Sequence, residues 1–197
     1  DVYLDGLAHA EKLTATEIVT ALPVPLVDPA DVAATVLSAT VLSQPVQTLD
    51  SLRAARHGGL DSEGVDLKES VELPLMEVRA LLDLGDVAKA NRKLEDLAER
   101  VGWRWRLVWF KAVSELLTGD YDSATKHFTE VLDTFPGELA PKLALAATAE
   151  LAGTSDERPF YNTVWHTDNN MISAGFGLAR AQSVEGERAG AVNTLDE

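Results

Sequence analysis

Three glycines set the framework of this 197-residue chain, because they recur at one interval. Gly85, Gly119 and Gly153 lie 34 residues apart, and each follows a segment whose apolar residues are spaced three and four apart. Glycine at such a point ends a helix, since it adopts the left-handed backbone conformation without steric cost. Further positions keep their chemical class over the same interval: a small residue (Ala90 and Ala124), a large one (Leu94 and Phe128) and a terminating one (Gly102 and Pro136).

This interval and these residue classes are those of the tetratricopeptide repeat (TPR), a pair of helices joined by a short turn. Small residues let the two helices approach, and large ones fill the space between them. The stretch from Trp105 to Pro136 fits the pattern well, with its turn at Gly119-Asp120. We therefore predict an all-α fold, a TPR-like α-solenoid of antiparallel helix pairs. First helices would line a concave surface and second helices would form the convex back.

The third and fourth units are less regular than the first two. In the third, the second helix is built on Tyr161, Val164 and Trp165 and lies one residue out of phase. The fourth begins at Ser173, and the chain stops within its second helix. We expect a TPR-like helical repeat domain over residues 28–197 that is truncated at its C-terminal end.

Residues 1–27 lack the repeat pattern. Because the chain starts with Asp1, we expect them to form a connector from an upstream domain. Thr14 and Glu17 have the spacing of a capping box, which predicts a short helix from Glu17 to Leu22, before two prolines enforce extended backbone.

A helix pair is predicted to follow this connector. Asp28-Pro29 indicates a helix start with Asp as N-cap, and that helix would end near Ser43. A second helix from Pro45 to Gly58 would complete a hairpin of TPR-like size. The glycine- and acid-rich residues 58–67 predict a flexible loop, since their spacing does not fit a calcium-binding loop.

The composition of residues 102–106, Gly-Trp-Arg-Trp-Arg, has two interpretations. Alternating Trp and Arg side chains are typical of a cation–π recognition patch. A repeat needs bulk at this point, however, so we favour packing of Trp105 and Trp109 against the neighbouring hairpin. Arg104 and Arg106 would then reach water.

Charge and composition argue against several classes of partner. The formal net charge is −15 and the pI is about 4.6, whereas nucleic acids and anionic membranes recruit clusters of Lys and Arg. The chain has no cysteine, which excludes thiolate metal and redox sites. No apolar run approaches the length of a membrane span. We expect a cytoplasmic location and neither nucleic acid nor membrane as partner.

The sequence offers no catalytic constellation and no metal or cofactor site. Gly175 and Gly177 do not complete a nucleotide-binding motif, because Arg180 stands where a third glycine belongs, so we predict that they permit close helix packing. The signatures of kinases and hydrolases are also missing. No metal-ligand spacing occurs among the four histidines, His9, His57, His127 and His166.

A protein-binding groove is the remaining candidate site. Positions five and nine of successive first helices would supply its side chains, although packing is the favoured role for Leu143 and Ala147. A partner's C-terminal carboxylate would find no clamp here, because the positions that need Lys or Asn hold Leu75, Met76, Phe110 and Ala144. The predicted groove residues are Leu75, Arg79, Trp109, Val113, Leu143 and Ala147.

Three functional classes remain open at this point. A peptide- or partner-binding module needs an exposed groove, whereas an intramolecular regulatory or dimerisation element needs a groove covered by its own chain or by a second copy. An enzyme needs converging polar groups and is the weakest of the three.

Four segments carry a resemblance to a known family. They are ALPVPLVDPAD, LLDLGDVAKA, WRWRLVWFKAVSELLTGDYDSATKHF and GFGLARAQSVEGERAGAV. Together with the VYLDGL start, they resemble the C-terminal TPR regions of the mycobacterial serine/threonine protein kinase G family, and the likeness covers the whole chain.

The resemblance implies what would lie outside this segment. In that family an ATP-dependent kinase domain and a rubredoxin-like metal domain precede the TPR array. It also implies dimer contacts and docking of a substrate with an FHA domain. None of the kinase's catalytic or metal-binding residues can be assigned to this segment, because their motifs are absent from it. The alternative is an autonomous peptide-binding TPR adaptor without an attached enzyme.

Overall fold

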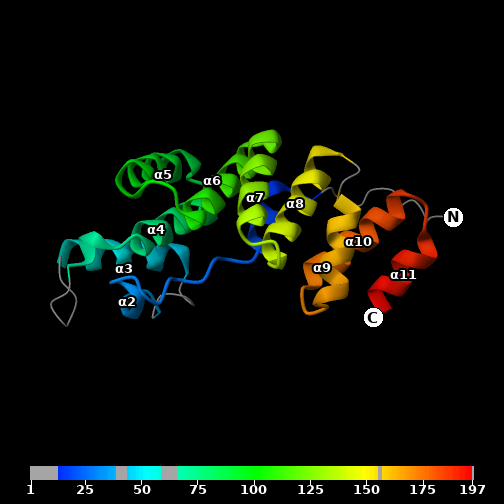
Figure 1. Cartoon of the computed structure of the whole chain (residues 1–197), viewed down its shortest axis with the longest axis horizontal. Coiled ribbons are helices and arrows are strands. Elements are labelled where there is room, and N and C mark those ends of the chain that lie inside the picture. The colour runs from blue at the N-terminus through cyan, green and yellow to red at the C-terminus, as the bar shows by residue number, and fades with distance from the viewer. Residues whose placement is uncertain (1–12, 39–43, 59–65, 155–156, 197) are drawn as a thin grey trace.

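A computed structural model describes residues 13–38, 44–58, 66–154 and 157–196, and its regular elements there are helices. Figure 1 shows an elongated array in which successive helices stack along the long axis. In chain order the helices are α1 (Ala15–Ala21), α2 (Ala34–Ser38), α3 (Pro45–Gly58), the short 3₁₀ helix η2 (Leu67–Glu69), α4 (Glu72–Asp83), α5 (Val87–Val101), α6 (Trp105–Thr118), α7 (Tyr121–Thr134), α8 (Leu139–Ala152), α9 (Glu157–Thr167), α10 (Ile172–Val184) and α11 (Arg188–Asp196).

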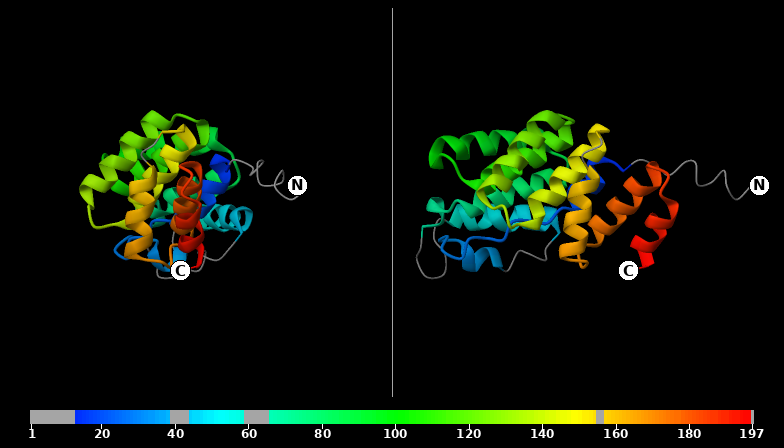
Figure 2. Two further views of the ribbon diagram at one scale, coloured as in Figure 1. Left: turned by 90° about the vertical axis from the view of Figure 1, so that its right-hand side faces the viewer. Right: turned by 45° about the vertical axis from the view of Figure 1, so that its right-hand side comes forward.

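Four helix pairs form the body of the array: α4 with α5, α6 with α7, α8 with α9, and α10 with α11. From α3 to α11 each helix packs against the next one along the chain, so every pair also contacts its neighbour. Figure 2 shows the same stack from its end and obliquely. This arrangement confirms the predicted TPR-like α-solenoid.

Glycine ends the first helix of each pair, as the repeat register predicts. Gly85, Gly119, Gly153 and Gly186 have φ angles of 75°, 79°, 71° and 85°, a conformation that other residues rarely adopt. Aspartate then begins the second helix in the first two pairs. The Asp120 carboxylate, for example, accepts the backbone N–H of Ser123 at 3.2 Å.

The small and large positions of the repeat lie where the helices cross. Ala90, Ala112, Ala124 and Ala146 are completely buried. Phe128 is also completely buried, and the Trp109 ring meets it edge-on with centroids 5.2 Å apart. These residues belong to a continuous core that extends from α4 to α10, which confirms the residue classes assigned from the 34-residue interval.

Two glycines allow α10 to pack closely on α9. A Cβ atom at Gly177 would lie closer than 3.0 Å to the Tyr161 ring, and one at Gly175 would lie 2.9 Å from Trp165. The Tyr161 hydroxyl is fixed from the other side, since it donates to Glu150 at 2.6 Å. The packing role predicted for these glycines is confirmed.

The region before the repeats differs in part from the prediction. The capping box is present, with Thr14 as N-cap of α1, and α3 has the predicted bounds. The prediction of a helix starting at Asp28-Pro29 is wrong, because residues 29–33 form turns and a bend and α2 begins at Ala34. Asp28 and Asp31 bond the backbone two residues ahead of them, each at 2.9 Å, which competes with helix formation.

The remainder of this region contributes a small second core. Leu37 of α2 and Leu52 of α3 pack there with residues of α4. The glycine-rich loop predicted over residues 58–67 lies largely outside the described residues. Among the described helices, none combines the length and the apolar character needed to cross a membrane.

Candidate functional site: the concave groove and the segment inside it

The first helices place the predicted groove residues in a row along α4, α6 and α8. Only Arg79 retains appreciable exposure, at 30% of its side chain, and it forms an ion pair with Asp83 at 3.7 Å. The other five, Leu75, Trp109, Val113, Leu143 and Ala147, are at most 5% exposed. In this structure the row is therefore covered rather than open to solvent.

Part of the cover at this face comes from the N-terminal segment of the chain, because residues of α1 share a cavity with Leu143 and Ala147, whereas Trp109 packs against Phe128 of its own helix pair. Residues 13–31 run along the concave side of the array, and Figure 1 shows this segment passing from α1, behind α7 and α8, towards α2. Helix α1 packs on α6, and its residues Ile18 and Leu22 are 5% and 7% exposed within the main core. The segment thus runs opposite to the direction in which the repeats follow one another.

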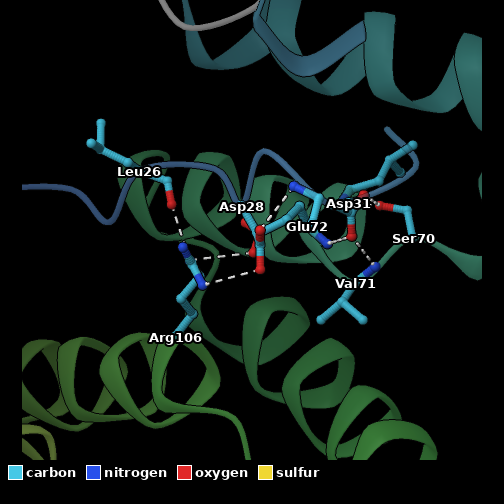
Figure 3. A network of polar contacts seen from close by, with 9 residues as sticks. Leu26, Asp28, Asp31, Ser70, Val71, Glu72 and Arg106 are labelled. Carbon is cyan, nitrogen blue, oxygen red and sulfur yellow. Dashed lines mark hydrogen bonds and ion pairs between the residues drawn. The ribbon is translucent and has the colours of Figure 1, made fainter. Parts of the chain in front are cut away.

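We call residues Leu26 to Asp31 the strap. Its first anchor is Arg106 of α6, whose Nε donates to the Leu26 carbonyl at 3.0 Å and lies 3.3 Å from a Glu72 carboxylate oxygen (Figure 3). The Asp28 carboxylate lies 3.9 Å from the same guanidinium group. Arg106 is 19% exposed, so the prediction that it reaches water is wrong. The strap supplies partners that a local sequence pattern does not reveal.

The second anchor is Asp31, which caps α4 from 39 to 41 residues away along the chain. Its carboxylate accepts the Ser70 hydroxyl at 2.6 Å and the backbone N–H groups of Val71 and Glu72 at 2.8 and 3.1 Å. Helix α4 has no side-chain cap at its own N-cap residue, Val71. A negative charge at this end also interacts favourably with the helix dipole. Asp31 therefore takes the place of an N-cap residue for α4.

The Arg106 guanidinium group has two carboxylates beside it, those of Glu72 and Asp28, and Asp31 lies at the neighbouring end of α4. The pKa values of Asp31 and Glu72 shift in opposite directions. Burial alone would raise the pKa of Asp31, but hydrogen bonds from Ser70 and the backbone outweigh it and lower that pKa. Burial raises the pKa of Glu72; Arg106 opposes this shift, and the charges of Asp31 and Asp28 add to it. The charge state of the strap junction is thus sensitive to acid.

The aromatic side chains beside this junction mostly pack, but the ring contacts lie within their own helix pair and not, as predicted, against the neighbouring hairpin. Trp105 meets Phe135 edge-on with centroids 5.3 Å apart, and Trp109 is buried. The Arg106 guanidinium lies 4.5 Å from the Trp105 ring centre, which gives a cation–π contact within the protein. Trp103 is the exposed member at 53%, and its indole N–H donates to Glu130.

A cavity of about 220 Å³ remains between α1 and the first helices α8 and α10. Its walls include Leu143 and Ala147, so the structure brings together two of the predicted groove residues, and Ile18 and Leu22 face them from α1. Its charged groups already have partners. Arg180 donates to Glu150 at 2.6 and 2.9 Å, and Glu17 bonds Thr14 in the capping box. The lining therefore favours apolar side chains.

Catalytic and metal-binding geometry does not emerge from the described residues. No group of three or more His, Asp or Glu side chains is placed there to hold a metal ion. His127 pairs with Glu115 at 2.7 Å and His166 with the Asn162 carbonyl at 2.9 Å, while His9 lies outside the described residues.

Prediction from the sequence missed the residues that close the groove. Ile18 and Leu22, four apart on a capped helix, do carry a signal, because they mark an apolar stripe that needs a partner surface. Asp31, Glu72 and Arg106 carry none, since their partners are distant along the chain.

Comparison with known proteins identifies the family. The model described as "Protein kinase G tetratricopeptide repeat" matches residues 1–197. The chain belongs to this family. Two similar proteins are named serine/threonine-protein kinase PknG, one from Mycolicibacterium smegmatis and one from Mycobacterium leprae, and they are 81% and 79% identical over 100% of this chain. This chain spans 26% of the length of each of these two kinases.

Solved structures of other proteins share the fold of this chain. MamA from Desulfovibrio magneticus is 15% identical with a TM-score of 0.61, and the match covers 87% of this chain and 94% of that one. A tetratricopeptide repeat protein from Parabacteroides merdae is also 15% identical with a TM-score of 0.61, over 86% and 66% of the two chains. At this identity the likeness concerns the TPR fold alone.

Proposed function

We propose that this chain is the protein-interaction and scaffolding domain of a serine/threonine protein kinase whose catalytic domain lies upstream. The array would hold that domain in a defined position and dock protein substrates, including the FHA-domain substrate that the family implies. ATP and the rubredoxin-like metal site would belong to the upstream domains. A cytoplasmic location is part of the same proposal.

The observation that supports a scaffolding role is the closed concave groove. Residues 13–31 occupy it, and the strap is held by polar contacts to α4 and α6 rather than by loose apolar contact. A segment fixed in this way would hold an upstream domain in a defined position relative to the array, because the strap cannot shift without breaking hydrogen bonds of charged groups. An autonomous peptide adaptor needs an open groove, and five of the six predicted groove residues are buried here.

The test uses the kinase in its full length, with this chain as its TPR region. We would measure the rate at which it phosphorylates an FHA-domain protein and, separately, a short peptide. Deleting the array should lower the first rate at least about tenfold, a loss of roughly 1.4 kcal/mol of transition-state binding, and leave the second nearly unchanged.

A matched pair of arginine variants refines this test. Arg106→Ala frees the strap and should lower the rate for the protein substrate. Arg104→Ala removes a neighbouring arginine whose contact is with the adjacent Trp103 carbonyl, and it should have no effect. Equal rates with and without the array would contradict the proposal.

Self-association is a second candidate, favoured by apolar side chains exposed on the last pair. Phe176, Val192 and Leu195 are 52%, 57% and 55% exposed on α10 and α11. Light scattering should then give twice the 21.2 kDa of the chain, and Leu195→Glu should restore the single mass. A single mass for both proteins would exclude a dimer through this face.

A further inference from the structure

Helix α1 and the strap are attached to the array by different kinds of contact. Among the described residues, the hydrogen bonds of Thr14, Glu17 and Thr20 stay within α1 and its cap. Its contact with the array depends on the apolar side chains of Ile18 and Leu22, with Leu13 and Val19 partly buried beside them. The strap is instead anchored by charged hydrogen bonds. One end of the segment is therefore fixed by polar contacts, and the other end, within the part of the chain that the structure describes, is held by apolar packing.

Helix α1 is short, with only seven residues. A helix of this length is marginal in water, so α1 is helical because the groove and its cap support it. Residues 22–25 between α1 and the strap have no regular secondary structure and include Pro23 and Pro25, so no helix has to be broken for α1 to move. The geometry provides a hinge between a fixed strap and a detachable helix.

The groove under α1 is also incompletely filled. The cavity of about 220 Å³ is smaller than the roughly 300 Å³ at which pockets for drug-sized molecules begin, so it suits side chains better than a whole small molecule. Phe176, which is 52% exposed, forms part of its wall, and the Arg180 and Tyr161 polar groups are committed to Glu150. Bulkier apolar side chains than those of α1 would fill this space.

We propose that α1 is an internal ligand of the concave groove, which an amphipathic helix of a partner protein displaces. The displacing helix carries large apolar residues at positions i and i+4, as α1 does with Ile18 and Leu22, and bulk that reaches the cavity. The strap stays bound and keeps the displaced segment close. This inference rests on the proposed function only in taking the array as a protein-interaction domain, and it names the kind of partner that the groove accepts once α1 has left it.

Occupancy by α1 lowers the apparent affinity of any competing helix. The apparent dissociation constant is the intrinsic one divided by the fraction of molecules in which the groove is open. A groove that is open in one molecule of ten thus binds a partner about ten times more weakly than an emptied groove. Removing the apolar side chains of α1 should reveal the intrinsic affinity.

The test measures binding of a fluorescein-labelled peptide with the sequence of residues 13–25 to three forms of the complete 197-residue chain. These are the wild type, Ile18→Ser with Leu22→Ser, and a control with Thr16→Ala and Thr20→Ala on the exposed face of the same helix. Fluorescence anisotropy should show at least about tenfold tighter binding to the serine variant than to the other two. A peptide with Phe in place of Ile18 should bind the serine variant more tightly still.

Circular dichroism and thermal unfolding of the same three proteins should show an unchanged array. Equal peptide affinity for all three would overturn the proposal, as would the absence of binding to the serine variant. Loss of the array fold in that variant would also overturn it, because α1 would then be an indispensable part of the core. Weaker binding of the Phe peptide would exclude the cavity as a place for the partner's side chain.

Hydrogen exchange on the wild type gives a test without substitutions. Amides of residues 18–21 should exchange by local opening at least about tenfold faster than those of residues 108–116 in α6. Equal exchange would mean that α1 does not leave the groove separately. These measurements use the array without a kinase domain, so their failure is distinct from failure of the scaffolding role.

Discussion

Replacing Gly177 by Ala tests how closely α9 and α10 pack. In an exposed helix this change stabilises by about 1 kcal/mol, because alanine has the better helix propensity. Here the new methyl group would lie closer than 3.0 Å to the Tyr161 ring, whereas unstrained contacts begin near 3.4 Å. The ring cannot swing away cheaply, since Tyr161 is 2% exposed and its hydroxyl is bonded to Glu150.

The expected net effect of this substitution is destabilising. Overpacking of a core costs about 1–3 kcal/mol, and loss of the Tyr161 hydrogen bond would add about 1 kcal/mol. After the propensity gain is subtracted, Gly177→Ala should lower the free energy of unfolding by about 1–3 kcal/mol. For a chain of this length each kcal/mol corresponds to about 2–4 °C in Tm.

Gly190→Ala is the matched control, because it is the same change in the neighbouring helix. Its Cβ would lie 3.4 Å from the end of the flexible Gln182 side chain, so it should gain about 0.5–1 kcal/mol. Urea and thermal unfolding followed by circular dichroism would measure both variants. If Gly177→Ala proved as stable as the wild type, or if both changes had the same sign, the close packing inferred at α9 and α10 would be wrong.

Three further predictions concern the repeat register, the strap and the groove. Ala124→Glu should cost several kcal/mol, because Ala124 is completely buried between two helices; a thermal midpoint within a few degrees of wild type would refute this placement. Asp31→Asn should cost about 1–2 kcal/mol at pH 7. The lowered pKa of Asp31 means that its contribution is present above its ordinary value of 3.8 and is lost as pH falls through the lower folded-state pKa, so urea unfolding at pH 3 should show a smaller difference than at pH 7. An EEVD-type peptide should not bind in calorimetry, since the residues in place of a carboxylate clamp are apolar and Arg79 is paired with Asp83; micromolar affinity would contradict this.

The repeat body could be predicted from sequence because its determinants are local. The glycine at each turn, the aspartate after it and the alanine four or five residues on act within one or two helical turns, and each position is repeated 34 residues away. Even the irregular glycines of the fourth unit were interpretable, since Gly175 and Gly177 are small residues in a first helix that must pack. Local chemistry and tertiary packing agree at these positions.

The path of the N-terminal segment could not be predicted in the same way. Asp28-Pro29 has the pattern of a helix start, but Asp28 bonds the backbone of a turn, and Asp31 three residues later caps α4. Arg106 resembled a solvent-exposed member of a Trp-Arg alternation, yet its partners are a carbonyl and two carboxylates far away along the chain. Residues that pair over such distances leave no periodic signal, and side-chain type alone does not select among the available acids.

The course of the N-terminal segment also sets an order of events during synthesis. Helix α1 is made first, but α10, which helps to enclose it, is complete only at Val184. At about 5–20 residues per second the interval between them is roughly 8 to 30 seconds. During that time the helix pairs can fold one after another, because each needs only its neighbour. Helix α1 packs on α6, which is complete at Thr118, whereas the part of the cavity wall that α10 contributes is added only later. A chain that assembles pair by pair as it is made is thus, once finished, connected from α1 to its later pairs.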